Sequence, residues 1–304
     1  MKRLRVAVLM GGPSAEREVS LQSGRMVVEA LQATGAMVMP IDVEGTTVNF
    51  PEHVDVAFIA MHGTFGEDGH LQQILEERGI AYTGSDPGSS ARAFDKVLAK
   101  ECFMASGIPT PSYAVANESL AGVDELQWPL VVKPARQGSS MGVSIVRDRA
   151  TLRQACQQAR QFDGQILIEQ FVRGRELTVG ILGRQTLPVI EIRTPSGFFD
   201  YRAKYTAGAA EEIVPAPLDA TTTARAQFFA LRAHECLGCR DFSRVDIMLS
   251  DQGQMAVLEV NTIPGLTPNS LLPKAAKAAG LSMADLCTRM IEMALARRTE
   301  AVAA

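Results

Sequence analysis

Two oxygen-bearing side chains stand close together in the stretch LEVNTIPGLTPNS, residues 258–270. Glu259 and Asn261 are two residues apart on an expected strand, so both side chains point to the same face. A carboxylate and an amide side by side offer the oxygen atoms that bind hard divalent cations. The stretch therefore directs attention to the strand that pairs with it.

The preceding residues 243–250 form a second apolar run, which predicts a β-hairpin with residues 254–261. With Gln252 and Gly253 as a two-residue tip, Asp246 lies directly opposite Glu259. The same face then carries Met248 and Val257, and the other face carries Val245, Ile247, Leu249, Leu258 and Val260.

Two facing carboxylates between apolar neighbours destabilise a sheet unless a cation holds them. The pattern predicts a site in which Asp246, Glu259 and Asn261 bind a metal, with Mg²⁺ the best match. The alternative is a solvated edge on which Asn261 merely begins a turn. A register shift of one residue would separate the three side chains.

A glycine- and serine-rich segment could hold the phosphates that commonly accompany Mg²⁺. KPARQGSSMGVSIV, residues 133–146, places Lys133 at a strand end and then a loop with Gly138 and Ser139. Backbone N–H groups of such a loop can approach an anion closely. The order of lysine and glycines is not that of a Walker A loop, and the alternative is a mobile turn.

Bulk composition restricts the class of partner. The chain of 304 residues carries a net charge of −4 without charged tails, so neither a nucleic acid nor a membrane surface is expected as partner. The apolar run of residues 6–10 is too short for a signal peptide. Five cysteines without regular spacing favour a reducing compartment, the cytoplasm. Cys236 and Cys239 lack further zinc ligands and are expected to be buried thiols.

The order of expected elements divides the chain. Strands and helices alternate over the first ninety residues, which predicts a small parallel sheet with flanking helices. A helix over residues 94–107 and the stiff segment IPTPSY mark a boundary. Beyond it, strands follow one another closely with turns between them, which favours antiparallel pairing and an α+β fold.

The combination of a lysine-bearing strand, a glycine-serine lid and an acidic hairpin resembles the ATP-grasp fold. The further motifs GGPSAEREVSLQSG, MHGTFGEDG, KYTAG and NTIPGLTPNSLLP resemble the D-alanine–D-alanine ligase family, and the likeness extends over residues 4–290. It implies a substrate domain at 1–95, a central ATP-grasp subdomain with the lid at 96–178, and a C-terminal subdomain at 179–304. It also implies ATP-dependent joining of two D-alanine molecules through an acyl phosphate, for peptidoglycan synthesis.

The resemblance implies a role for each matching residue. Asp246, Glu259 and Asn261 would hold two Mg²⁺ (or Mn²⁺) ions, with Glu259 bridging them. The residues that would bind ATP are Lys96, Lys133, Glu169, Gln170, Val172 and Glu176. Those that would bind D-alanine or act in catalysis are Glu16, His62, Ser139, Lys204, Tyr205, Arg244, Gly265, Ser270 and Leu271.

Within that set the physical reasons differ. Glu16 would hold the ammonium of the first D-alanine, although a first-turn acid that stabilises a helix is the alternative reading. Arg244 and the Gly265 N–H would stabilise an oxyanion. Tyr205 resembles the members that form a dipeptide rather than a depsipeptide. His53, His70 and His234 have no companions at metal-ligand spacing and are expected to be structural or exposed.

Two other functions remain open from the residues alone. An ATP-grasp ligase that joins a different carboxylate to a different amine would need the same nucleotide and metal residues. A regulator that binds a nucleotide without turnover would also keep the fold. The family commonly forms dimers, so a homodimer is possible.

Overall fold

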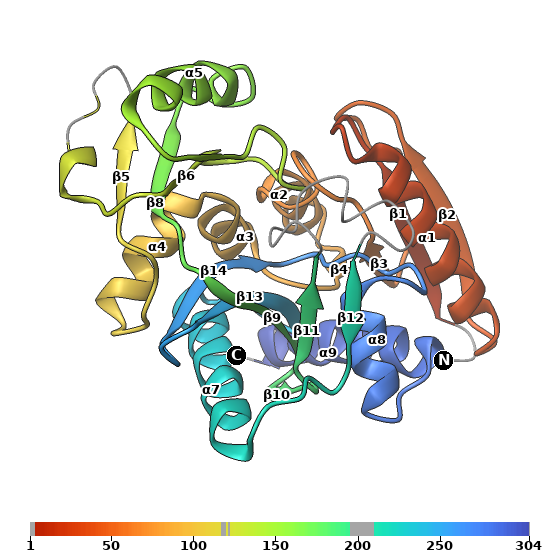
Figure 1. The fold of residues 1–304 in the computed structure, drawn as a ribbon. Helices are drawn as coiled ribbons and strands as arrows, with labels where there is room; N and C mark the ends of the chain where they lie inside the picture. Colours follow the sequence, from red (N-terminus) through yellow and green to blue (C-terminus); the bar gives the residue numbers. More distant parts are fainter. Residues whose placement is uncertain (1–3, 117–119, 121, 195–209, 304) are drawn as a thin grey trace.

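The computed structural model describes residues 4–116, 120, 122–194 and 210–303. Figure 1 shows three sheets with their helices arranged around the middle of the molecule. None of the helices among the described residues is both long and apolar enough to span a membrane.

The first sheet is parallel, as predicted, with the strand order β2-β1-β3-β4. Its strands are β1 (Arg5–Gly11), β2 (Met37–Val43), β3 (Val56–Ile59) and β4 (Ala81–Tyr82). Residues 6–10 and the whole of β3 are buried, because helices cover both faces of a parallel sheet. The helices that follow these strands are α1 (Arg17–Gln32), α2 (His70–Glu77) and α3 (Pro87–Phe94).

The second sheet is antiparallel and has the order β5-β8-β6-β7. It consists of β5 (Tyr113–Ala116), β6 (Leu130–Pro134), β7 (Ser144–Val146) and β8 (Ile166–Gln170). Helices α4 (Lys96–Ala105) and α5 (Arg149–Ala159) belong to this part of the chain, together with the short 3₁₀ helix η1 (Val123–Glu125). Asp95 and Asp148 cap the two α-helices by accepting backbone N–H groups.

The third sheet is also antiparallel, with the order β12-β11-β9-β13-β14 and β10 paired to β9. Its strands are β9 (Gly174–Leu182), β10 (Gln185–Thr186), β11 (Ile190–Arg193), β12 (Glu211–Ile213), β13 (Phe242–Ser250) and β14 (Met255–Asn261). The helices of this part are α7 (Ala220–Cys236), α8 (Leu271–Ala278) and α9 (Met283–Ala303). The expected α/β unit followed by two α+β units is therefore confirmed.

One hydrophobic core joins the two ends of the chain. Val8 and Phe58 of the first sheet share a cluster with Leu272, Leu286 and Ile291 of the last two helices. Burial of these side chains makes α8 and α9 a support for the N-terminal sheet. The boundaries at residues 95 and 178 stay a prediction.

The cysteines lie away from both cavities described below. All five are free, and Cys156, Cys239 and Cys287 are buried. Burial raises the pKa of Cys239 and of Cys287 to about 12, so these thiols remain protonated at neutral pH. Cys239 packs in the core as predicted, whereas Cys236 is only half-buried, so the prediction of two buried thiols is confirmed for Cys239 alone.

Candidate active site

Two neighbouring pockets lie where the three sheets meet. The first, a cavity of about 210 Å³, is bounded by the N-terminal unit, β14 and the start of α8. The second, of about 110 Å³, lies between the second and third sheets. Four residues belong to the walls of both pockets: Lys96, Gln137, Ser139 and Glu259. A ligand that fills both pockets would therefore be in contact with these four at its middle.

The acidic hairpin forms one wall of both pockets. Asp246 pairs with Glu259, and Arg244 pairs with Asn261, in the register that the sequence predicts. The tip differs, because Ser250 and Gln254 close a loop of residues 251–253 instead of a two-residue turn. The tip prediction is therefore wrong by one residue.

A β-bulge at Leu258 compensates for that error. Ile247 pairs with Val257, while Asp246 pairs with Glu259, so Leu258 is skipped. Leu258 consequently faces the second pocket beside Met248, whereas Val257 is fully buried in the core. The predicted faces of Leu258 and Val257 are thus reversed, since a one-residue shift turns a side chain to the opposite face.

Arg244 and Thr178 hold Asp246 from two sides. Arg244 Nε and Nη2 donate to the two oxygens of Asp246 at 3.0 and 2.8 Å. The Thr178 hydroxyl donates to Oδ1 at 2.6 Å. Burial alone would lower the pKa of Arg244, but Asp246 and Glu259 raise it above its ordinary value, so the guanidinium keeps its charge.

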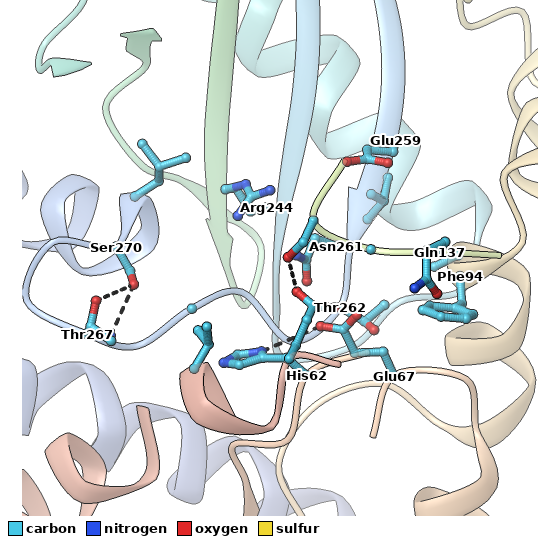
Figure 2. Close-up of a pocket in the computed structure, with 18 of the residues that line it drawn as sticks. His62, Glu67, Phe94, Gln137, Arg244, Glu259, Asn261, Thr262, Thr267 and Ser270 are labelled. Carbon is cyan, nitrogen blue, oxygen red and sulfur yellow. Dashed lines mark hydrogen bonds and ion pairs between the residues drawn. The ribbon is translucent and has the colours of Figure 1, made fainter. Parts of the chain in front are cut away.

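The donor set of the hairpin suits a hard cation that brings further oxygen ligands with it. Among the described residues, no group of three His, Cys, Asp or Glu side chains could hold a metal unaided. Two carboxylates and the Asn261 amide do converge at the two pockets, and Figure 2 shows Glu259 and Asn261 lining the first. Lys96 Nζ lies 3.2 Å from Glu259, where a positive charge is already favoured. Mg²⁺ commonly retains water and phosphate ligands, so the small protein set fits it.

The predicted phosphate segment leads from the second pocket to the first. Lys133 at the end of β6 lies 2.5 Å from Glu169 of β8 and lines the second pocket. Ser139 and Ser140 both have left-handed backbone, with φ of 52° and 56°. At Gly138 an added Cβ would lie 2.5 Å from Glu16 Oε2, so only glycine allows the loop to approach this carboxylate.

Glu16 lies at the point where the loop meets the N-terminal unit. It precedes α1 as the N-cap residue, yet its side chain makes no capping hydrogen bond. The carboxylate instead accepts a short hydrogen bond from the Ser139 hydroxyl. The geometry therefore disfavours the reading of Glu16 as a helix-stabilising acid and favours a role in the pocket.

His62 and Glu67 form a buried pair beside Glu16. His62 Nδ1 donates to the Ile263 carbonyl at 2.9 Å and lies 3.6 Å from Glu67 Oε1. Nε2 forms a hydrogen bond of 2.9 Å with the Ser23 hydroxyl, and Ser23 Oγ also accepts the Leu266 N–H. These contacts fix the ring orientation.

The charges of this pair depend on each other. Burial raises the pKa of Glu67, the nearby Glu16 adds to the rise, and His62 opposes it. Burial alone would lower the pKa of His62, but Glu67 and Glu16 raise it overall. Both shifts favour the protonated form of each group, next to Glu16 in the wall of the first pocket. Figure 2 shows both side chains on the same side of this pocket.

The start of α8 closes the far side of the first pocket. Ser270 is the N-cap residue of α8, and its hydroxyl lies 2.8 Å from Thr267 Oγ1 and accepts the Thr267 N–H at 3.1 Å. Gly265 lines the same wall, where an added Cβ would lie 2.7 Å from Ser270 Oγ. Leu271 follows at the first position of the helix. Backbone N–H groups at such a helix start suit a carboxylate.

The structure brings the described candidate residues together. Those that line the first pocket are Glu16, His62, Lys96, Ser139, Arg244, Glu259, Asn261, Gly265, Ser270 and Leu271. Those that line the second are Lys96, Lys133, Ser139, Glu169, Gln170, Val172, Glu176, Asp246 and Glu259. Lys204 and Tyr205 lie outside the described residues. The role assigned to each residue stays a prediction.

Sequence reasoning missed four participants. Glu67 lies within the quoted motif MHGTFGEDG. Its position five residues after His62 is the sequence signal that could have identified it. Gln137 precedes the glycine-serine loop and lines both pockets. Thr178 bonds to Asp246, and Lys100 pairs with Glu169, from elements that the fold brings alongside, so no local sequence pattern marks them.

Comparison with known proteins gives one consistent family. The model described as "D-ala D-ala ligase C-terminus" matches residues 105–292, and "D-ala D-ala ligase N-terminus" matches residues 44–85. A D-alanine–D-alanine ligase of Methylacidiphilum infernorum is 46% identical over 96% of this chain and 96% of its own. That of Syntrophotalea carbinolica is 46% identical over 98% of each chain.

Solved structures agree with these matches. The D-alanine–D-alanine ligase of Bacillus anthracis in complex with ATP is similar at a TM-score of 0.86 and 33% identity, over 98% of this chain and 99% of that one. The VanG D-Ala:D-Ser ligase of Enterococcus faecalis is similar at a TM-score of 0.85 and 31% identity, over 96% of this chain and 100% of that one.

Proposed function

Because the chain belongs to the D-alanine–D-alanine ligase family, we propose that its second pocket binds ATP and its first pocket binds two molecules of D-alanine. The protein is an ATP-dependent ligase that forms D-alanyl-D-alanine for peptidoglycan. The observation that carries the proposal is the wall shared by both pockets. Lys96, Gln137, Ser139 and Glu259 lie where a γ-phosphate would meet a substrate carboxylate.

The second pocket offers groups that match the parts of a nucleotide. Apolar Val172 and Leu258 suit a base, and Glu176 suits the ribose hydroxyls. Glu169 Oε1 is buried and lies 2.8 Å from Lys100 Nζ as an ion pair, without an aligned hydrogen-bond donor among the described residues. The Glu169 carboxylate is part of the wall of this pocket and lies between Lys100 and Lys133. Lys133 and Lys96 supply positive charge for the phosphates.

Asp246, Glu259 and Asn261 would hold Mg²⁺ or Mn²⁺. When bound, such ions neutralise the charge on the triphosphate, which is the main demand of phosphoryl transfer. Two ions held by these three side chains would balance the charge of the several phosphate oxygens. Lys96 would then move from Glu259 to a phosphate, since both are anionic partners within reach of the same ammonium.

In the first pocket, Glu16 would bind the ammonium of the first D-alanine and leave its carboxylate directed at the shared wall. Transfer of the γ-phosphoryl group would give an acyl phosphate and ADP. The amine of the second D-alanine would attack the acyl carbon, and phosphate would leave. Arg244 and the Gly265 N–H line the pocket where the oxyanion would form. Ser270 and the Leu271 N–H would bind the second carboxylate, with Lys204 from outside the described residues.

Two features of the first pocket disfavour the other functions. A regulator that binds only a nucleotide has no use for a half-buried Glu16 beside the buried His62 and Glu67, because acidic groups gathered without a ligand destabilise a fold. Glu16 and Ser270 also line this pocket, at the positions that the resemblance assigns to D-alanine, which disfavours a ligase for a different carboxylate and amine.

A coupled assay of ADP release tests the proposal. Turnover is expected with D-alanine, ATP and Mg²⁺, and not with L-alanine or with EDTA. Glu259→Ala should abolish turnover while the protein stays folded, because it removes metal ligands and no core packing. Asp251→Asn, at the exposed tip of the same hairpin, is the matched control and should retain full activity. ATP hydrolysis that is indifferent to D-alanine would refute the proposal.

We place this enzyme in the cytoplasm, where ATP is available and where the five free thiols would remain reduced. A homodimer stays a prediction. Sedimentation of the purified protein measures the assembly directly.

A further inference from the structure

Lys100 is a fully buried lysine that lines neither pocket. It lies on α4 one turn after Lys96, so both side chains emerge from the same face of the helix. Its relative exposure is 0%, which is rare for a lysine and requires partners for the ammonium. The reaction outlined above gives this residue no part.

Three oxygen atoms surround the ammonium. Lys100 Nζ donates to Thr110 Oγ1 at 2.7 Å and to the Pro111 carbonyl at 2.9 Å, and lies 2.8 Å from Glu169 Oε1. It also lies 5.0 Å from the ring centre of Tyr113. This set of partners satisfies a charged lysine and holds it against Glu169, a residue of the second pocket that Lys100 itself does not line.

Glu169 connects Lys100 to the nucleotide pocket. Its carboxylate, 2% exposed, has Lys100 on one oxygen and Lys133 at 2.5 Å on the other. Burial alone would raise the pKa of Glu169, but Lys100 and Lys133 together lower it, so the carboxylate is ionised. The three groups therefore carry one net positive charge, and Lys133 is the member that borders both Glu169 and the pocket.

Without Lys100 the balance would change. Glu169 and Lys133 would neutralise each other, and Lys133 would be drawn fully to the carboxylate. The pair of Glu169 and Lys133 would then bring no net positive charge to a phosphate, and Lys96 would act without it. Glu169 would also lose the contact that sets the position of Oε1.

We propose that Lys100 is a positioning residue for ATP. Lys100 holds Glu169 in place and balances part of the negative charge of Glu169, so that Lys133 can bind phosphate. This rests on the proposed nucleotide pocket. Residues 109–111, between α4 and β5, are part of the same support. Thr110 Oγ1 donates to the Val257 carbonyl of β14 at 2.8 Å, and the Val257 N–H donates to the Pro109 carbonyl at the same distance. Lys100 thereby links the nucleotide wall to the strand that carries Glu259.

The test compares Lys100→Met with the wild-type protein by calorimetric titration of ADP and by steady-state kinetics. The dissociation constant for ADP and the KM for ATP are expected to rise about tenfold or more, because a buried carboxylate loses one of its two partners. The KM for D-alanine should change less than about twofold, since Lys100 lies outside the first pocket. Lys277→Met, at an exposed position of α8, is the matched control and should leave all three values unchanged.

A double variant separates positioning from general damage to the fold. In a Glu169→Gln background the added Lys100→Met change should weaken ADP binding by less than about threefold. The reason is that the introduced glutamine carries no negative charge for Lys100 to balance. The same factor in both backgrounds would overturn the proposal, as would ADP binding within twofold of wild type in Lys100→Met. Lys100→Gln, which keeps a donor for Thr110 and Pro111, is measured in the same way if Lys100→Met does not fold. Absence of ADP binding by the wild-type protein would instead refute the nucleotide pocket itself.

Discussion

Thr178 and Asp246 face each other across β9 and β13, and the Thr178 hydroxyl donates a 2.6 Å hydrogen bond to Asp246 Oδ1. Thr178 is 1% exposed, so no water competes for this hydroxyl. Arg244 occupies the same carboxylate from the other side. The position of Asp246 is therefore fixed before any cation arrives, which is the preorganisation that metal sites require of the groups around their ligands.

Removal of the Thr178 hydroxyl should weaken metal binding. For Thr178→Val we expect the Mg²⁺ concentration for half-maximal turnover to rise about tenfold, as is typical when the hydrogen-bond partner of a metal ligand is lost. Mn²⁺ titration followed by electron paramagnetic resonance should show the same weakening without turnover. The Mg²⁺ concentration for half-maximal turnover is measured at saturating ATP and D-alanine. The Mn²⁺ titration is carried out with ADP present.

Thr178→Ser is the conservative variant and should restore most of the metal affinity, because it keeps the hydroxyl. Thr221→Val, at an exposed position of α7, should behave as the wild type. Equal metal affinity in Thr178→Val and wild type would show that the hydrogen bond serves the fold alone.

Gly180 lies two residues further along β9, opposite Arg244. An added Cβ would lie 2.7 Å from Leu272 Cδ1 and 3.0 Å from Leu187 Cδ1, both buried. Gly180→Ala should lower the free energy of unfolding by about 1–3 kcal/mol, as overpacking of a core does. It should also raise the KM for the second D-alanine, since Leu272 follows Leu271 at the start of α8. Urea unfolding and kinetics at varied D-alanine measure the two effects.

Gly164→Ala is the control for Gly180→Ala, because in the described part of the chain no heavy atom beyond the two adjoining residues lies within 4 Å of the added Cβ. It should change neither stability nor KM beyond error. Unchanged stability of Gly180→Ala would mean that Leu272 and Leu187 can move aside at no cost, contrary to the prediction.

The hairpin illustrates what a sequence can and cannot predict. Its strands, and the pairing of Asp246 with Glu259, follow from alternating apolar residues and a turn signal. The actual tip and the bulge at Leu258 each shift the register by one residue, in opposite directions. The two shifts cancel, so the predicted pairing is correct although the predicted tip is wrong and the sequence does not predict the bulge. Bulges depend on the neighbouring packing, and no residue type at Leu258 marks one.

Other parts of the site depend on contacts between distant segments. The Glu16 carboxylate accepts a hydrogen bond from Ser139, which lies 123 residues away in the sequence. His62 Nδ1 donates to the carbonyl of Ile263, which lies 201 residues away. The family resemblance supplied those residues as candidates, but only the fold places them together. Lys100 and Thr178 act through neighbours in the interior, so their importance follows from burial and hydrogen bonding and not from sequence pattern.

A buried histidine that lines neither pocket makes stability sensitive to acid. His234, in the last turn of α7, is 4% exposed, and its Nδ1 lies 2.7 Å from Ser243 Oγ. Burial lowers the pKa of His234 to about 4. The unfolded chain, with an ordinary histidine pKa of about 6.5, binds the proton first as pH falls. Stability is thus lost from about pH 6.5 down to about pH 4, by up to roughly 3 kcal/mol from this group.

His234→Gln should remove that part of the acid sensitivity, because glutamine does not titrate. The free energy of unfolding, measured in urea at pH 7 and pH 4.5, should fall less in His234→Gln than in wild type, while carboxylates contribute equally to both proteins. The variant is expected to be less stable than wild type at pH 7, since it disturbs a packed site, so the difference between the two pH values is the informative quantity. His53→Gln, at an exposed position, should follow the wild-type pH dependence. An equal fall in His234→Gln and wild type would show that the buried ring accepts a proton in the folded state as readily as in the unfolded chain.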